Sequence, residues 1–185
     1  MSSRIEQSDL APLISLVHHR WNIPIVAELQ RHSGAKFVTM VNHLDVSRAS
    51  LSASLADLVA RGLVIKNTGH GHPMRPEYLL TTDGKSIGEQ CLALTRIVRQ
   101  GEEADLAFRK WTLPLIAVIG TETRRFNEMR SHLVGATPRA IAIGLKSLLE
   151  QRWASRSLID EYPPTAGYRL MLKGQRVLGC VVGLY

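Results

Sequence analysis

The sequence has little cysteine, few aromatic residues and no long apolar run. Its 185 residues include two cysteines, Cys91 and Cys180, too few for a disulfide framework, so we expect a reducing, cytoplasmic setting. No apolar stretch reaches the roughly 18 residues of a transmembrane helix, and residues 1–7 do not resemble a signal peptide. We therefore expect no membrane partner.

Positive charge is what the sequence has in excess. Twenty-three Lys and Arg residues against 16 Asp and Glu residues give a formal net charge of +7, and residues 91–185 carry most of that excess. Apolar types make up 45% of the chain, which is enough to build a folded core. Basic soluble proteins of this kind often bind polyanions, so a polyanion is the expected kind of partner.

The chain repeats itself at an offset of 89 or 90 residues. The matched pairs share apolar or turn-forming character and include Trp21 with Trp111, Pro24 with Pro114, Ala27 with Ala117, His43 with His132, Leu55 with Leu145, Tyr78 with Tyr168, and Gly84 with Gly174. The repeat predicts a first unit over residues 8–92, a connecting helix over 93–108 and a second unit over 109–185. We expect an intrachain pseudo-dimer.

In the first unit the pattern predicts three helices and a β-hairpin. Asn22 is the expected cap of the first helix, residues 37–44 form the second, and Ser47 caps the third. The third helix has an apolar stripe and ends near Gly62; the stripe is Leu51, Leu55 and Leu58. Strands at 63–65 and 78–81 then flank a hairpin tip at 67–73, and Gly84 opens a closing helix.

The second unit repeats this order. Thr112 is the expected cap of its first helix, residues 126–133 form the second, and Thr137 with Pro138 begins the third. The apolar stripe of the third helix is Ile141, Leu145 and Leu148, and the hairpin tip lies at residues 160–164. Residues 177–185 are too apolar to lie in water and are expected to bury against the chain or a second copy.

Three helices followed by a hairpin predict a winged helix-turn-helix, a mainly α fold with small β wings whose third helix enters the major groove of DNA. In the first unit this helix offers small and polar side chains, which allow close approach to base edges. The residues expected to contact DNA lie on the third helices, the wings and the second-helix region: Lys36, Ser47, Arg48, Ala49, Ser52, His70, His72, Arg75, Arg124, Arg125, Thr137, Arg139 and Lys146.

Several motifs together resemble the HxlR-type winged-helix regulators of bacteria. In the second unit they are KWTLPL at 110–115, RRFNEM at 124–129, TPR at 137–139, YPP at 162–164 and YRLMLKG at 168–174. In the first unit they are RW at 20–21, KF at 36–37, RGLV at 61–64 and PEYLLTTDG at 76–84. The resemblance implies a dimeric, DNA-binding transcription regulator, some relatives of which are controlled by a cysteine.

The chain departs from that family pattern in three respects. It holds two units where a typical member holds one. No cysteine precedes Trp21 and none lies between Gly101 and Trp111, so neither tryptophan helix has the sensing cysteine that commonly precedes it in the family. The second wing also carries Asp160 and Glu161, which repel phosphate. The two winged-helix units, each a DNA-reading head, are therefore expected to contact DNA differently. An asymmetric DNA site follows from this difference.

The sequence also contains features that suggest functions other than DNA binding. Trp21 and Trp111 are candidates for a small-molecule effector pocket, and the apolar C-terminal helix is a candidate for a homodimer contact. A metal at His70 and His72, with His18 and His19, is not expected, because zinc usually takes four ligands at set spacing; no cofactor is expected either. A protein-interaction scaffold and a ligand-binding protein that lost DNA binding remain alternatives, whereas no catalytic motif indicates an enzyme.

Overall fold

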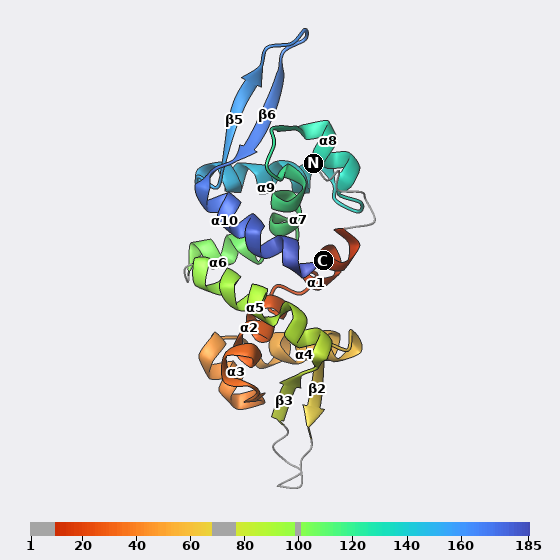
Figure 1. Ribbon diagram of the computed structural model, residues 1–185, viewed down its shortest axis with the longest axis vertical. Helices are drawn as coiled ribbons and strands as arrows, with labels where there is room; N and C mark the ends of the chain where they lie inside the picture. The colour runs from red at the N-terminus through yellow and green to blue at the C-terminus, as the bar shows by residue number, and fades with distance from the viewer. Residues whose placement is uncertain (1–9, 68–76, 99–100) are drawn as a thin grey trace. The chain divides into compact units, whose positions relative to one another are not determined.

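The computed structural model describes residues 10–67, 77–98 and 101–185, mostly as helices with two small sheets (Figure 1). The chain divides into two compact units. The first unit is His19–Arg96, and the second is Met1–His18 together with Ile97–Tyr185. The prediction of a mainly α fold with small β wings is confirmed.

The first unit contains three helices, a hairpin and a closing helix. Its helices are α2 (Asn22–His32), α3 (Phe37–Leu44), α4 (Arg48–Ala60) and α5 (Thr82–Ile97), and its strands are β1 (Ala35–Lys36), β2 (Val64–Asn67) and β3 (Glu77–Leu80). The strands form an antiparallel sheet in the order β1-β3-β2. Most of the predicted hairpin tip lies outside the described residues.

The second unit has the same order of elements. Its helices are α1 (Ala11–Leu16), α6 (Glu102–Ala107), α7 (Thr112–Ile119), α8 (Phe126–His132), α9 (Pro138–Glu150), α10 (Leu172–Val181) and the 3-10 turn η2 (Val182–Leu184). Its strands β4 (Arg124–Arg125), β5 (Ala154–Ile159) and β6 (Thr165–Leu170) pair antiparallel in the order β4-β6-β5. The β5–β6 hairpin projects beyond the helices of this unit (Figure 1).

Local capping signals locate the third helix of each unit. The Ser47 hydroxyl accepts a hydrogen bond from the Ser50 N–H at 3.2 Å, and the Thr137 hydroxyl accepts one from the Ala140 N–H at 3.1 Å. Both predicted caps are confirmed, and Pro138 occupies the first turn of α9 as expected. The apolar stripes of both helices are fully buried, as the spacing predicts.

The predicted caps at Asn22 and Thr112 are wrong. Each is the first residue of its helix and is buried, and Trp21 or Trp111 takes the cap position without a side-chain hydrogen bond. The Asn22 side chain points to a neighbouring helix instead, where its Nδ2 donates to Asp57 at 2.8 Å. A polar residue at a helix start therefore serves tertiary packing here.

The C-terminal segment is buried within the second unit, as its composition predicts. Val177, Val181 and Leu184 are inaccessible or nearly so, and α10 packs against α7. Cys180 is buried in the same segment, which raises the pKa of its thiol, and Cys91 is buried in the first unit; neither forms a disulfide. Within the described residues, every helix is too short or too polar to traverse a lipid bilayer.

Candidate nucleic-acid interface

Helix α4 presents a continuous exposed face in the first unit. Ser47, Arg48, Ala49 and Ser52 are exposed, while Leu51, Ser54 and Leu55 are buried on the opposite face. No acidic side chain lies in the first turn of α4, so the positive end of the helix dipole is not neutralised there. The first turn of α4 therefore carries no negative charge, although the exposed Asp45 lies two residues before Ser47.

A partly buried polar network connects α4 to α2. The Asp57 carboxylate accepts hydrogen bonds from Asn22 Nδ2 at 2.8 Å, from Arg61 Nε at 2.6 Å and from Arg61 Nη2 at 3.1 Å. Burial raises the pKa of Asp57, but the hydrogen bonds from Arg61 and Asn22 outweigh burial and hold the pKa below its usual 3.8. The Asn22–Asp57 hydrogen bond therefore ties α4, which carries the exposed face, to the start of α2.

The first unit adds exposed cations beside α4. Lys36 is exposed at the start of α3, and Lys66 is exposed on β2. Lys66 lies just after the predicted strand at 63–65 and was not among the expected DNA contacts. Its positive charge beside that strand was the only signal in the sequence. His70, His72 and Arg75 lie outside the described residues.

Helix α9 presents a more mixed face in the second unit. Thr137, Arg139 and Lys146 are exposed, as expected for DNA contacts, but Ile143 between them is 52% exposed. Lys146 also lies 3.7 Å from the exposed Glu150 carboxylate. A surface pair of this kind contributes little, so Lys146 can exchange Glu150 for a phosphate at small cost.

The basic residues before α8 are partly neutralised inside the second unit. The Arg125 guanidinium forms an ion pair with Glu161 of the wing tip, and Arg124 lies 3.7 Å from Glu122. The Arg125 N–H also donates to Glu128 at 2.9 Å, which secures the start of α8. The acidic wing tip and one of the expected DNA contacts therefore bind each other.

Two exposed arginines on the second wing were missed from the sequence. Arg156 on β5 and Arg169 on β6 are exposed, and register places Arg156 opposite Tyr168 and Arg169 opposite Ser155. Alternation along the strands puts the two arginines on opposite faces of the hairpin. The only available signal was their positive charge on either side of the predicted hairpin tip.

The two matched tryptophans lie in equivalent places in the two units. Trp21 and Trp111 are half-buried, with the Arg20 guanidinium 5.1 Å from the centre of the Trp21 ring and the Lys110 ammonium 5.2 Å from that of Trp111. Each cation lies within the range of a cation–π contact. The effector pocket at these residues stays a prediction.

Each unit has the three helices and wing of a winged helix-turn-helix, with the third helix capped and exposed on one face. The chain belongs to the HxlR-like helix-turn-helix family, whose model matches residues 16–104 and again residues 106–185. The resemblance drawn from the motifs is confirmed in both units.

The chain is also similar to a protein of known structure. A crystal structure from Porphyromonas gingivalis W83, described as a transcriptional regulator of the MarR family, is 26% identical over 42% of this chain and 76% of that chain, with a TM-score of 0.40. No curated protein matches the sequence.

Proposed function

We propose that this chain is a DNA-binding transcriptional regulator with two non-equivalent reading heads on one polypeptide. The observation that carries the proposal is the exposed first turn of α4, which has no acidic residue, and its counterpart on α9, each in a unit of a helix-turn-helix family. Ser52 and Arg139 are both exposed. Burial of either face would instead have favoured a protein-interaction scaffold or a ligand-binding protein.

The protein would make two kinds of contact with DNA. Exposed cations outside the third helices, such as Lys36, Lys66 and Arg156, suit phosphates, which fix position and orientation but carry no sequence information. Arg48 and Arg139 near the starts of α4 and α9 suit base edges, because arginine pairs with guanine in the major groove. The small residues Ala49 and Ser52 let the α4 backbone lie close to the bases.

The heads would read different half-sites. The α4 face is small and polar, whereas the α9 face includes the exposed Ile143, which suits the methyl group of thymine more than a phosphate. The Arg125–Glu161 pair also lowers the positive charge that the second wing offers to DNA. We therefore infer an asymmetric operator in place of a perfect palindrome.

Selection of bound sequences from random DNA with the full chain tests the proposal. Affinity for the selected site should fall with salt, with a log–log slope of about −0.9 for each phosphate contact. Arg48→Ala should weaken binding to the selected site by roughly 1–3 kcal/mol if Arg48 contacts a base. Arg96→Ala, an exposed arginine on α5 of the same unit, is the matched control and should change affinity little.

Two results would count against DNA reading. One is the recovery of no enriched sequence together with an affinity that does not depend on salt. The other is an equal effect of Arg48→Ala and Arg96→Ala, which would reduce Arg48 to one charge among many.

A further inference from the structure

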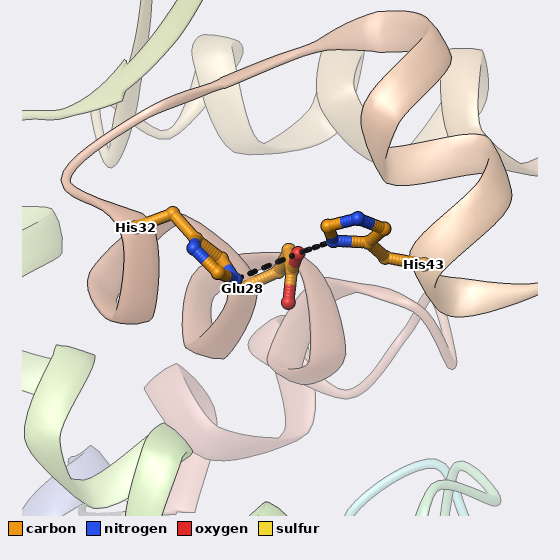
Figure 2. Close-up of side chains that lie close together, drawn as sticks. All are labelled: Glu28, His32 and His43. Carbon is orange, nitrogen blue, oxygen red and sulfur yellow. Dashed lines mark hydrogen bonds and ion pairs between the residues drawn. The ribbon is translucent and has the colours of Figure 1, made fainter.

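Packing of α2 against α3 brings together three potential metal ligands: Glu28, His32 and His43 (Figure 2). Glu28 and His32 are four residues apart on α2 and so share one face, and His43 comes from the last turn of α3. One ligand atom of each residue lies within 4.8 Å of those of the other two. We propose that this cluster is a binding site for a divalent transition-metal ion such as zinc.

The donor atoms already lie near the distances that zinc needs. His32 Nε2 is 3.4 Å from Glu28 Oε1, and zinc bonds of ~2.0–2.1 Å place neighbouring tetrahedral ligands roughly 3.3 Å apart. His43 Nδ1 is 2.6 Å from the same oxygen in a hydrogen bond. Zinc would displace the proton of that bond, and the two atoms would then separate by less than roughly 1 Å.

The second unit offers an internal comparison for Glu28. Offsets of 90 and 89 residues match Glu28 with Val118 and His43 with His132, so the second unit has one histidine but an apolar residue in place of the carboxylate. Val118 is 4% exposed and Glu28 is 2% exposed. The fold accepts a valine at this position, and burying a carboxylate costs free energy unless it is paired. Glu28 therefore has a role that core packing does not require.

The exposure of the ligands indicates an accessible site. The side chains of His32 and His43 are 46% and 49% exposed, so an ion can enter from solvent and a water can complete the coordination. The positive charge of Arg31, whose Nη1 lies 3.4 Å from Glu28 Oε2, opposes a cation, but this side chain is half-exposed and can turn into water. Two imidazole ligands favour zinc and other first-row transition metals over Mg²⁺ or Ca²⁺, which prefer oxygen ligands alone.

A bound ion would join α2 to α3, the helix that precedes α4 in the helix-turn-helix. His43 lies two residues before Asp45, the left-handed residue (φ 49°) that ends α3 before the turn into α4. The metal site itself does not depend on DNA binding, so its test needs no DNA.

Calorimetric titration of the full chain with zinc tests the site. Wild type should bind one zinc ion, and Glu28→Val and His43→Gln should each lower the zinc affinity at least about 100-fold. Loss of a contact that only supports a ligand typically lowers metal affinity ~10–100-fold, so a larger loss indicates a ligand. His132→Gln, the repeat partner of His43, and the double variant of His70→Gln and His72→Gln are controls that should keep this zinc. Magnesium should give no binding at this site.

Cobalt gives a second readout that does not rest on affinity alone. Co²⁺ in the site should show the visible absorption of four-coordinate nitrogen and oxygen ligation, and His43→Gln should abolish it. His43 is half-exposed, so this substitution leaves the core intact even if Glu28→Val perturbs folding. Zinc binding that survives both Glu28→Val and His43→Gln, or no zinc binding by wild type, would overturn the proposal.

Discussion

A single carboxylate, Asp57, links two helices of the first unit. It is partly buried on α4 and accepts hydrogen bonds both from Arg61, one turn further along α4, and from Asn22 at the start of α2. Hydrogen bonds to a charged acceptor stabilise more than neutral ones, and these two donors hold the pKa of Asp57 below 3.8 against the opposing effect of burial. A residue with a lowered pKa makes stability depend on pH.

Asp57→Asn should therefore reduce stability at neutral pH more than in acid. Above pH about 4 the carboxylate is ionised in both states and its contribution is fully present; the contribution is lost as pH falls through the lowered pKa of the folded state. We expect a loss of roughly 1 kcal/mol at pH 7, measured by urea unfolding, that shrinks towards pH 3. Glu77→Gln, which removes an exposed carboxylate on β3, should show no such pH dependence of its effect on the free energy of unfolding. If Asp57→Asn lowers the free energy of unfolding by the same amount at pH 7 and pH 3, the stabilising role given to the Asp57 carboxylate is wrong.

Helices and strands could be predicted from the sequence where the residues that fix their ends lie close together along the chain. The starts of α4 and α9 were predictable because Ser47 and Thr137 bond to N–H groups three residues away. Asn22 has the same chemistry but serves a partner 35 residues away, so its role could not be predicted locally. The two-residue strands β1 and β4 are too short for any periodicity and exist only through pairing with β3 and β6.

A matched glycine in each unit fixes how the closing helix meets the wing. A Cβ on Gly84 would lie 2.0 Å from the Leu63 carbonyl oxygen, and one on Gly174 would lie 2.3 Å from the Trp153 carbonyl oxygen. Each of these carbonyls also accepts a hydrogen bond from the residue just after the second strand of its hairpin, at 3.1 Å from Thr81 N and at 2.9 Å from Met171 N. The carbonyls therefore cannot move aside without losing a hydrogen bond at the end of the hairpin.

Gly174→Ala should destabilise the second unit by roughly 1–3 kcal/mol or more, because the clash is with backbone. Gly179 lies on the same helix and has nothing within 4 Å of an added Cβ, so Gly179→Ala should instead stabilise by up to about 1 kcal/mol. Thermal or urea unfolding of the two variants against wild type measures both. Similar stabilities for the two would show that the close approach in α10 relaxes at no cost.

At the scale of the whole chain, the repeat and its composition predicted the architecture but not the internal pairing of charges. The exposed face of α4 follows from the spacing of its apolar stripe, and the family match to both halves agrees with the duplication. The Arg125–Glu161 pair joins residues 36 positions apart, and the Glu28–His43 contact depends on how α2 meets α3. Neither contact has a spacing that a sequence pattern could reveal.

Two reading heads predict that a carboxylate placed on either third helix weakens DNA binding. Ala53 on α4 and Ala142 on α9 are exposed, and glutamate is a good helix former, so Ala53→Glu and Ala142→Glu should fold normally. Each substitution brings negative charge towards the phosphates and should lower the affinity for the selected site at least about tenfold. The double variant should lower the affinity further. Thr82→Glu, which adds the same charge at the exposed start of α5, is the control. Fluorescence anisotropy with labelled duplex measures all four, and an affinity untouched by Ala142→Glu would leave α4 as the single reader of DNA.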